Sequence, residues 1–319
     1  MSQTWEGEAE RKKCMNVRQT LNRVFILGNG FDVDLGYKTK YSDFAKSNEW
    51  KQLMKPIVGN HGHSLLKFMK TKEYTEEWFD IEASLLEYAR KASSNNVQYN
   101  IAEDENDYIK LCNALGKYMK NLKFSEFNKD SCAAQFARLL DSTMDIPIVF
   151  SFNFTPLEQN IEYIINNHVA TFNYMHGTLN DSDYILGFEC ENFDSIRKEY
   201  SFMFKSNNSN YKPGDMSENM LHAREVVIFG HSLNPIDFIY FKPYFLYIMQ
   251  TDEEGEDKRI LTIFTYNDYS ERIIKDNIRS MGISIPELSM HVKLKFLKTY
   301  NIEKGVEADA MRFQEFINQ

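Results

Sequence analysis

Four short apolar runs in this sequence end in small or polar residues whose types could do chemistry. The run at 23–27 is followed by Gly-Asn-Gly-Phe-Asp, and the run at 146–151 by Phe-Asn-Phe-Thr. The run at 169–175 is followed by His-Gly, and the run at 226–229 by Gly-His-Ser-Leu-Asn-Pro-Ile-Asp. If these runs are parallel strands, their ends meet at the sheet edge where α/β proteins bind ligands. The candidate ligand-binding residues there are Gly28, Asn29, Gly30, Phe31, Asp32, Asn153, Thr155, His176, Gly177, Gly230, His231, Ser232 and Asp237.

These residue types suit the binding and cleavage of a nucleotide. Glycine lacks a Cβ, so backbone N–H groups at 28–30 could approach a diphosphate. His176 could accept a proton near neutral pH, and the side-chain amide of Asn153 could orient a water or a ribose hydroxyl. Ser232 and Asp237 could hold a second ribose or a base. Such a set could cleave the glycosidic bond of a nucleotide through a transition state like that of glycoside hydrolysis.

The same residues also have structural interpretations, which the sequence leaves open. The glycines at 28–30 could form a plain tight turn, and His176 could cap a buried strand through a hydrogen bond. Thr155 precedes a proline and then Glu158, which is the pattern of a helix capping box. A capped helix N-terminus also attracts anions, so the two interpretations are compatible. His231 could be a structural hydrogen-bond partner.

The composition restricts the class of partner. The chain has 319 residues and a formal net charge of -9, which disfavours a general nucleic-acid binder because phosphate neutralisation needs surplus Lys and Arg. Cys14, Cys112, Cys132 and Cys190 are scattered, so we expect no structural metal, no disulfide framework and a reducing cytoplasm. The polar segment 1–21 reads as an N-terminal extension without a signal peptide, and no run is long enough to span a membrane.

Apolar runs that alternate with longer helical patterns predict an α/β fold. The runs are nearly all apolar, which favours a mostly parallel, Rossmann-like sheet with helices on both faces. We assign segments 22–40 and 145–319 to this nucleotide-binding core. The predicted strands are 23–27, 146–151, 169–175, 184–188, 225–230, 260–265 and 291–297.

The long gap after the first strand predicts a helical insertion at 41–144, because the gap exceeds one crossover helix. We expect this insertion to cover the ligand end of the sheet. A second interruption at 191–220, rich in Ser, Asn and aromatic residues, predicts a loop near the site. The helical patterns of the insertion are 41–54, 63–69, 78–92, 104–122 and 125–144.

The sequence resembles the AbiH family of bacterial phage-defence (abortive infection) proteins from about residue 22 to about residue 270. Its family-like elements are Gly-Asn-Gly-Phe-Asp at 28–32, Lys-Thr-Lys-Tyr-Ser-Asp-Phe at 38–44, Trp-Phe-Asp-Ile-Glu at 78–82, Ser-Phe-Asn-Phe-Thr at 151–155, His-Gly at 176–177, and Gly-His-Ser-Leu at 230–233 with Asp237. The resemblance implies an abortive-infection role. Asp80 fits a helix N-cap. Because the resemblance includes Trp-Phe-Asp-Ile-Glu, it also leaves open that Asp80 or Glu82 reaches the site.

More remotely, the layout is similar to sirtuins and sirtuin-like NAD hydrolases. This resemblance maps their Asn onto Asn153 and their His onto His176, and implies NAD as the substrate or ligand. Thr155 stands where sirtuins have Asp, and Phe152 where they have Gln. The four-cysteine zinc module of the deacylases is absent, which argues against protein deacylation.

We therefore predict a cytoplasmic protein that binds NAD or a related adenine nucleotide and hydrolyses it, with His176 as general base and Asn153 as the orienting residue. One alternative is a non-catalytic nucleotide sensor that switches a homo-oligomer or a partner protein. The other is a metal-dependent nucleic-acid effector. Its metal would need carboxylates such as Asp32, Asp34, Asp80 and Glu82, although Asp32 is also placed to meet a ribose hydroxyl.

Overall fold

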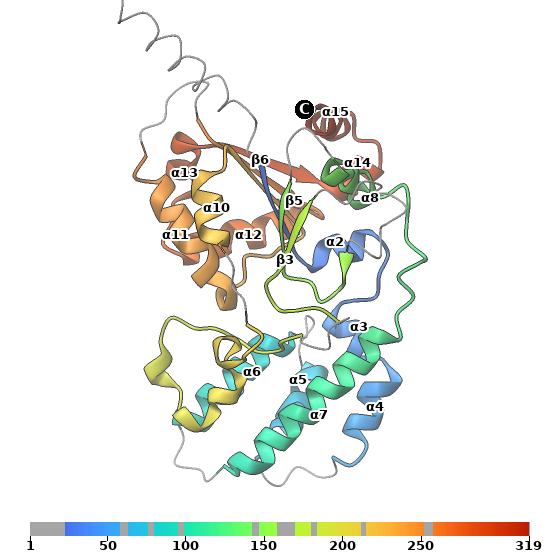
Figure 1. Ribbon diagram of the computed structural model, residues 1–319, viewed down its shortest axis with the longest axis vertical. Helices are drawn as coiled ribbons and strands as arrows, with labels where there is room; N and C mark the ends of the chain where they lie inside the picture. The colour runs from blue at the N-terminus through green and yellow to red at the C-terminus, as the bar shows by residue number, and fades with distance from the viewer. Residues whose placement is uncertain are drawn as a thin grey trace, which may run out of the picture.

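The computed structural model places a sheet with its covering helices next to a second, helical unit (Figure 1). It describes residues 23–57, 63–75, 80–94, 99–141, 147–157, 170–179, 184–211, 215–251 and 258–318. The predicted extension at 1–21 and the Trp78 and Glu158 positions lie outside these ranges.

The sheet has six strands in the order β3-β2-β1-β4-β5-β6, and every neighbouring pair is parallel. Val24 of the central strand β1 lies opposite Ile148 of β2 and Val226 of β4. The strand order reverses between β1 and β4, which is where doubly wound sheets bind their ligands. The strands are β1 (Arg23–Leu27), β2 (Ile148–Ser151), β3 (Thr171–Tyr174), β4 (Glu225–Phe229), β5 (Ile260–Thr265) and β6 (Lys293–Lys298).

The predicted α/β fold with a parallel sheet is confirmed, whereas the strand predicted at 184–188 is wrong. Within the described ranges, this segment is not a strand of the sheet. The Ile185 N–H donates to the His176 carbonyl at 2.7 Å, and Phe188 forms an isolated bridge with Phe204. Leu186 and Phe188 are apolar because they pack into the helical unit.

Helices cover both faces of the sheet, because successive side chains of a strand point to opposite faces. Phe25 and Leu27 of β1 pack with α2 (Asn29–Asp34), α8 (Cys132–Ala137) and α15 (Glu307–Ile317). Val24 and Ile26 pack on the other face. The helices there are α10 (Met216–His222), α11 (Phe238–Ile248), α12 (Asp268–Ser280) and α13 (Ile285–His291), while α14 (Thr299–Glu303) contacts α8 and α15.

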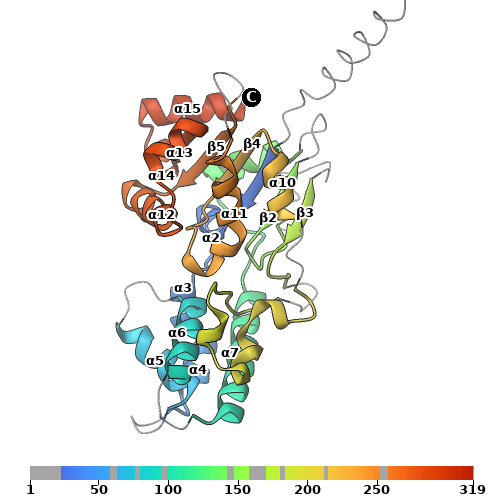
Figure 2. The same ribbon diagram turned by 90° about the vertical axis from the view of Figure 1, so that its left-hand side faces the viewer.

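The helical unit lies beside the sheet edge at which the strands end (Figures 1 and 2). The segment 184–204 packs into the same core, whereas α8, within the predicted insertion, packs on the sheet. The helix predicted at 41–54 is broken by Ser47, whose Oγ caps α4 by accepting from the Trp50 N–H at 3.1 Å. The helices of the unit are α3 (Tyr41–Ala45), α4 (Asn48–Met54), α5 (Leu65–Thr75), α6 (Ile81–Ser94) and α7 (Ile101–Lys120).

None of the helices in the described part of the chain has the length and apolar character needed to cross a bilayer.

Candidate functional site

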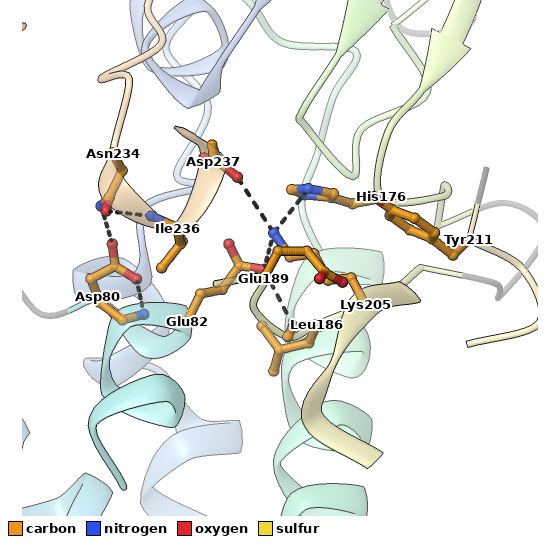
Figure 3. A network of polar contacts seen from close by, with 12 residues as sticks. Asp80, Glu82, His176, Leu186, Glu189, Lys205, Tyr211, Asn234, Ile236 and Asp237 are labelled. Atoms are coloured by element: carbon orange, nitrogen blue, oxygen red, sulfur yellow. Dashed lines mark hydrogen bonds and ion pairs between the residues drawn. The ribbon is translucent and has the colours of Figure 1, made fainter. Parts of the chain in front are cut away.

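Five buried polar side chains meet between the sheet and the helical unit, and we call them the edge cluster. Figure 3 shows Glu82, His176, Lys205 and Asp237 of this cluster. The five side chains come from four separate segments: α6, the loop after β3, the 184–211 segment and the loop after β4. The members are Glu82, His176, Lys205, His231 and Asp237.

Lys205 is at the centre of the edge cluster and is 0% exposed. Its Nζ lies 2.9 Å from His176 Nε2, 3.1 Å from Glu82 Oε1 and 3.7 Å from Asp237 Oδ1. Burial alone would lower the pKa of this lysine, but Glu82 and Asp237 raise it above its usual value. Lys205 is therefore a buried ammonium that contacts His176 and Glu82 closely and forms a longer ion pair with Asp237.

His176 follows β3. The pairing of β3 with β2 continues one residue beyond the strand, because the Met175 N–H donates to the Ser151 carbonyl at 2.8 Å. The His176 ring packs against Phe152 and Phe154, with centroids 5.3 and 6.3 Å away. Burial and the neighbouring Lys205 hold the pKa of His176 well below its usual value. The imidazole is thus neutral, and because Nε2 accepts from an ammonium, its proton is on Nδ1.

The loop after β4 holds the second histidine of the edge cluster. The Leu233 N–H donates to His231 Nδ1 at 3.0 Å, so the proton is on Nε2, which lies 3.4 Å from Asp237 Oδ2. Leu233 has a φ of 53°, a conformation that costs free energy for a residue other than glycine. Burial opposes ionisation of Asp237, but Lys205 and His231 outweigh burial and lower its pKa below the usual range.

The start of α6 supplies two carboxylates from the helical unit. Asp80 Oδ1 accepts from the Ala83 N–H at 3.1 Å, which caps the helix, and Oδ2 accepts from Asn234 Nδ2 at 3.2 Å. Glu82 contacts Lys205, accepts from the Gly187 N–H at 3.3 Å, and has its pKa raised by burial to about 7. Asp80 therefore caps the helix, as its position suggested, and Glu82 is the carboxylate of this pair that belongs to the edge cluster.

A second group, the Asp32 cluster, consists of Asp32, Asn153 and Thr155. Asn153 Nδ2 donates to Asp32 Oδ1 at 2.9 Å and to the Gly28 carbonyl at 3.1 Å, and Thr155 Oγ1 donates to Asp32 Oδ2 at 2.8 Å. Burial raises the pKa of Asp32 to about 7 despite these donors. Among the described residues, the buried Asn153 Oδ1 has no hydrogen-bond partner.

The glycines bring the loops after β1 and β4 into direct contact. The Gly28 N–H donates to the Phe229 carbonyl at 2.9 Å, and the Gly30 N–H to the Gly230 carbonyl at 2.8 Å. A Cβ on Gly28 would lie 2.5 Å from His231 Cα, and one on Gly30 would lie 2.6 Å from Gly230 Cα. The two amides predicted to face a diphosphate therefore donate to protein carbonyls in this structure.

The remaining candidates lie around these clusters. Phe31 is buried against Phe229, with ring centroids 5.1 Å apart, and so belongs to the core of the sheet. The exposed Asn29 is tied to Thr39, whose Oγ1 donates to its Oδ1 at 2.5 Å. Gly177 makes the turn after β3 with a φ of 69°. Ser232 is exposed, and its carbonyl accepts from Asn277.

The sequence did not predict Lys205 as a site residue. A single lysine in a segment rich in Ser and Asn carries no pattern that separates it from a surface lysine. The indirect signal was the resemblance that included Trp-Phe-Asp-Ile-Glu, because Glu82 is the carboxylate that Lys205 contacts.

Within the described ranges, no group of three or more His, Cys, Asp or Glu residues could hold a metal ion. The carboxylates considered for a metal-dependent nucleic-acid effector do not come together. Asp34 Oδ2 accepts from the Ala133 N–H of α8 at 2.7 Å, while Asp32 is bound to Asn153 and Thr155.

A model of the bacteriophage abortive infection AbiH family matches residues 24–254. The chain belongs to this family. No curated protein matches the chain. The AbiH match includes β1 from Val24 onward and every member of the edge and Asp32 clusters, and it supports a role in abortive-infection defence against phage.

Proposed function

We propose that this AbiH chain binds NAD or a related adenine nucleotide at the carboxyl edge of the sheet and hydrolyses the nicotinamide–ribose bond. One observation carries the proposal. At the carboxyl edge of the sheet, beside the point where the strand order reverses, a neutral histidine follows β3 and an asparagine follows β2, and the buried Oδ1 of this asparagine has no hydrogen-bond partner among the described residues. Loss of NAD would halt the growth of an infected cell, which suits an abortive-infection effector.

Asn153 is suited to orient a hydroxyl group. Both of its amide hydrogens are used, because Nδ2 donates to Asp32 and to the Gly28 carbonyl. This fixes the side chain so that Oδ1 is left to accept from a water or a ribose hydroxyl. Asp32, held in turn by Thr155, acts here as a positioning residue for Asn153.

His176 is the proposed general base. Water attacks the anomeric carbon of the ribose, the bond to the nicotinamide nitrogen breaks, and nicotinamide leaves with the bonding electron pair. His176 takes the proton of the attacking water, so the products are ADP-ribose, nicotinamide and one proton. A neutral imidazole is the form that this step requires, and burial together with Lys205 favours that form by lowering the pKa of His176.

The test is NAD turnover by the purified protein, with nicotinamide and ADP-ribose both quantified. We expect equal amounts of the two products, and a fall of at least about 100-fold in rate for folded His176→Ala. Lys242→Met is the matched control, because Lys242 pairs with Glu191 at a partly exposed position outside the clusters. Absence of both NAD binding and turnover in the wild type would contradict the proposal.

A second candidate is a nucleotide sensor without catalysis, and the contact between Lys205 and His176 favours it. The Nε2 lone pair that would accept a proton already accepts from Lys205 at 2.9 Å. NAD that binds but is recovered intact after long incubation would establish the sensor.

A further inference from the structure

We infer that Lys205 is a positioning residue for His176: its ammonium occupies Nε2, fixes the imidazole proton on Nδ1, and must move before Nε2 can accept a proton. The inference deepens the proposed function and rests on it for the catalytic consequence. The contact itself can be tested without any substrate.

The contact is enclosed on all sides. Lys205 is 0% exposed and His176 is 3% exposed, so water does not compete for the hydrogen bond between them. The Phe152 and Phe154 rings pack against the imidazole and restrict its rotation. An ammonium has no acceptor atom, so it can only donate, and Nε2 must be the acceptor.

The structure also offers the ammonium a second position. Asp237 Oδ1 lies 3.7 Å from Lys205 Nζ, beyond hydrogen-bond distance, and has no hydrogen-bond partner among the described residues. Glu82 Oε1, at 3.1 Å, remains within reach of the ammonium throughout. A small shift of Lys205 Nζ towards Asp237 would thus replace the hydrogen bond to His176 by one to the Asp237 carboxylate, and His176 Nε2 would be free.

The charged and titratable groups around the imidazole come from three packed elements. Lys205 lies on the 184–211 segment, Asp237 and His231 lie on the loop after β4, and Glu82 lies on α6. Lys205 is the cation in direct contact with the ring, whereas Asp237 favours protonation of His176. Removal of the Lys205 charge should therefore make His176 easier to protonate.

The experiment is nitrogen-detected NMR of the histidine rings in uniformly ¹⁵N-labelled protein without ligand, with His176 assigned by the loss of its signals in His176→Gln. We expect the wild-type ring to be neutral at pH 7 with its proton on Nδ1. In Lys205→Met the titration midpoint of His176 should rise by about one pH unit or more. Lys242→Met, which removes a lysine outside the clusters, should leave the midpoint unchanged.

A wild-type ring protonated on Nε2, or a midpoint that is the same in Lys205→Met, would overturn the inference. If Lys205→Met does not fold, the position of the proton on the wild-type His176 ring still tests the inference. Lys205→Arg, which keeps the charge, should preserve a neutral ring. In protein that turns over NAD, the acidic limb of the pH–rate profile should move upward in Lys205→Met by the same amount. Absence of both NAD binding and turnover would refute the proposed function and leave the NMR result in force.

Discussion

The Asp104 carboxylate of the helical unit and the edge cluster differ in how completely their buried carboxylates are paired. In the helical unit, Asp104 accepts from the hydroxyls of Tyr88 at 2.5 Å and Tyr200 at 2.8 Å, and from the Leu65 N–H at 3.0 Å. We call this set the Asp104 cluster. In the edge cluster, Asp237 Oδ1 has no hydrogen-bond partner among the described residues, although it is equally buried.

The difference separates a cluster that stabilises the fold from one that is prepared for a ligand. The donors of the Asp104 cluster tie α5, α6, α7 and the 184–211 segment together, and no acceptor is left to a substrate. In the clusters at the sheet edge, Asn153 Oδ1 and Asp237 Oδ1 have no hydrogen-bond partner within the described ranges, although Asp237 Oδ1 forms a long ion pair with Lys205. Buried unpaired oxygens cost stability, and in native proteins they mark positions retained for another reason.

The largest expected change in stability is for Asp104→Ala. The substitution leaves two tyrosine hydroxyls and one N–H buried without an acceptor, so we expect the free energy of unfolding to fall by about 3 kcal/mol. Urea denaturation followed by circular dichroism measures the loss. A loss below about 1 kcal/mol would show that the Asp104 cluster does not hold the helical unit together.

The next effect is a dependence of stability on pH that comes from the Asp32 cluster. Because the pKa of Asp32 is raised to about 7 in the fold, the folded state binds more protons than the unfolded state between about pH 4 and pH 7. The contribution of this group to stability is therefore present at low pH and is lost as the pH rises through about 7.

Asp32→Asn removes the titration and keeps the shape of the side chain. Relative to this variant, the wild type should lose about 2 kcal/mol of unfolding free energy between pH 5 and pH 7. Urea denaturation of both proteins at the two pH values measures the difference. Parallel behaviour of the two proteins would mean that Asp32 is ionised throughout this range.

The smallest effect is expected for Tyr200→Phe. It removes one donor from Asp104 Oδ2 and retains the ring that packs against Tyr88, so we expect a loss of about 1 kcal/mol. Thermal unfolding detects it as a modest fall in Tm. A loss as large as that of Asp104→Ala would show that one hydroxyl carries the whole Asp104 cluster.

The fold was predictable where burial leaves a pattern in the sequence. The strands at 23–27 and 225–230 were predicted closely because a strand covered on both faces is apolar at nearly every position, here at all but the first residue of each strand. The segment 184–188 has the same composition for a different reason, since its side chains fill the helical unit. An apolar segment can be predicted to be buried, but its composition does not reveal whether it is buried in the sheet or in the helical unit.

The site was predictable only in its strand-end residues. His176, His231 and Asp237 do meet, because parallel strands bring their ends to one edge. Lys205 comes from a segment without regular pattern, and its burial depends on the packing of α6 against the 184–211 segment. The glycines were identified, but the close approach of two loops explains them in this structure.

The most direct test of a site at the sheet edge compares the rate of nicotinamide release from NAD by Asn153→Ala and by Tyr200→Phe. Both variants are first checked for folding. We expect Asn153→Ala to release nicotinamide at least about 100-fold more slowly than the wild type, because the orienting oxygen is gone. Tyr200→Phe should remain within about twofold of the wild type, since it alters only the paired Asp104 cluster. Equal rates in the two variants would contradict the assignment of the site to the sheet edge.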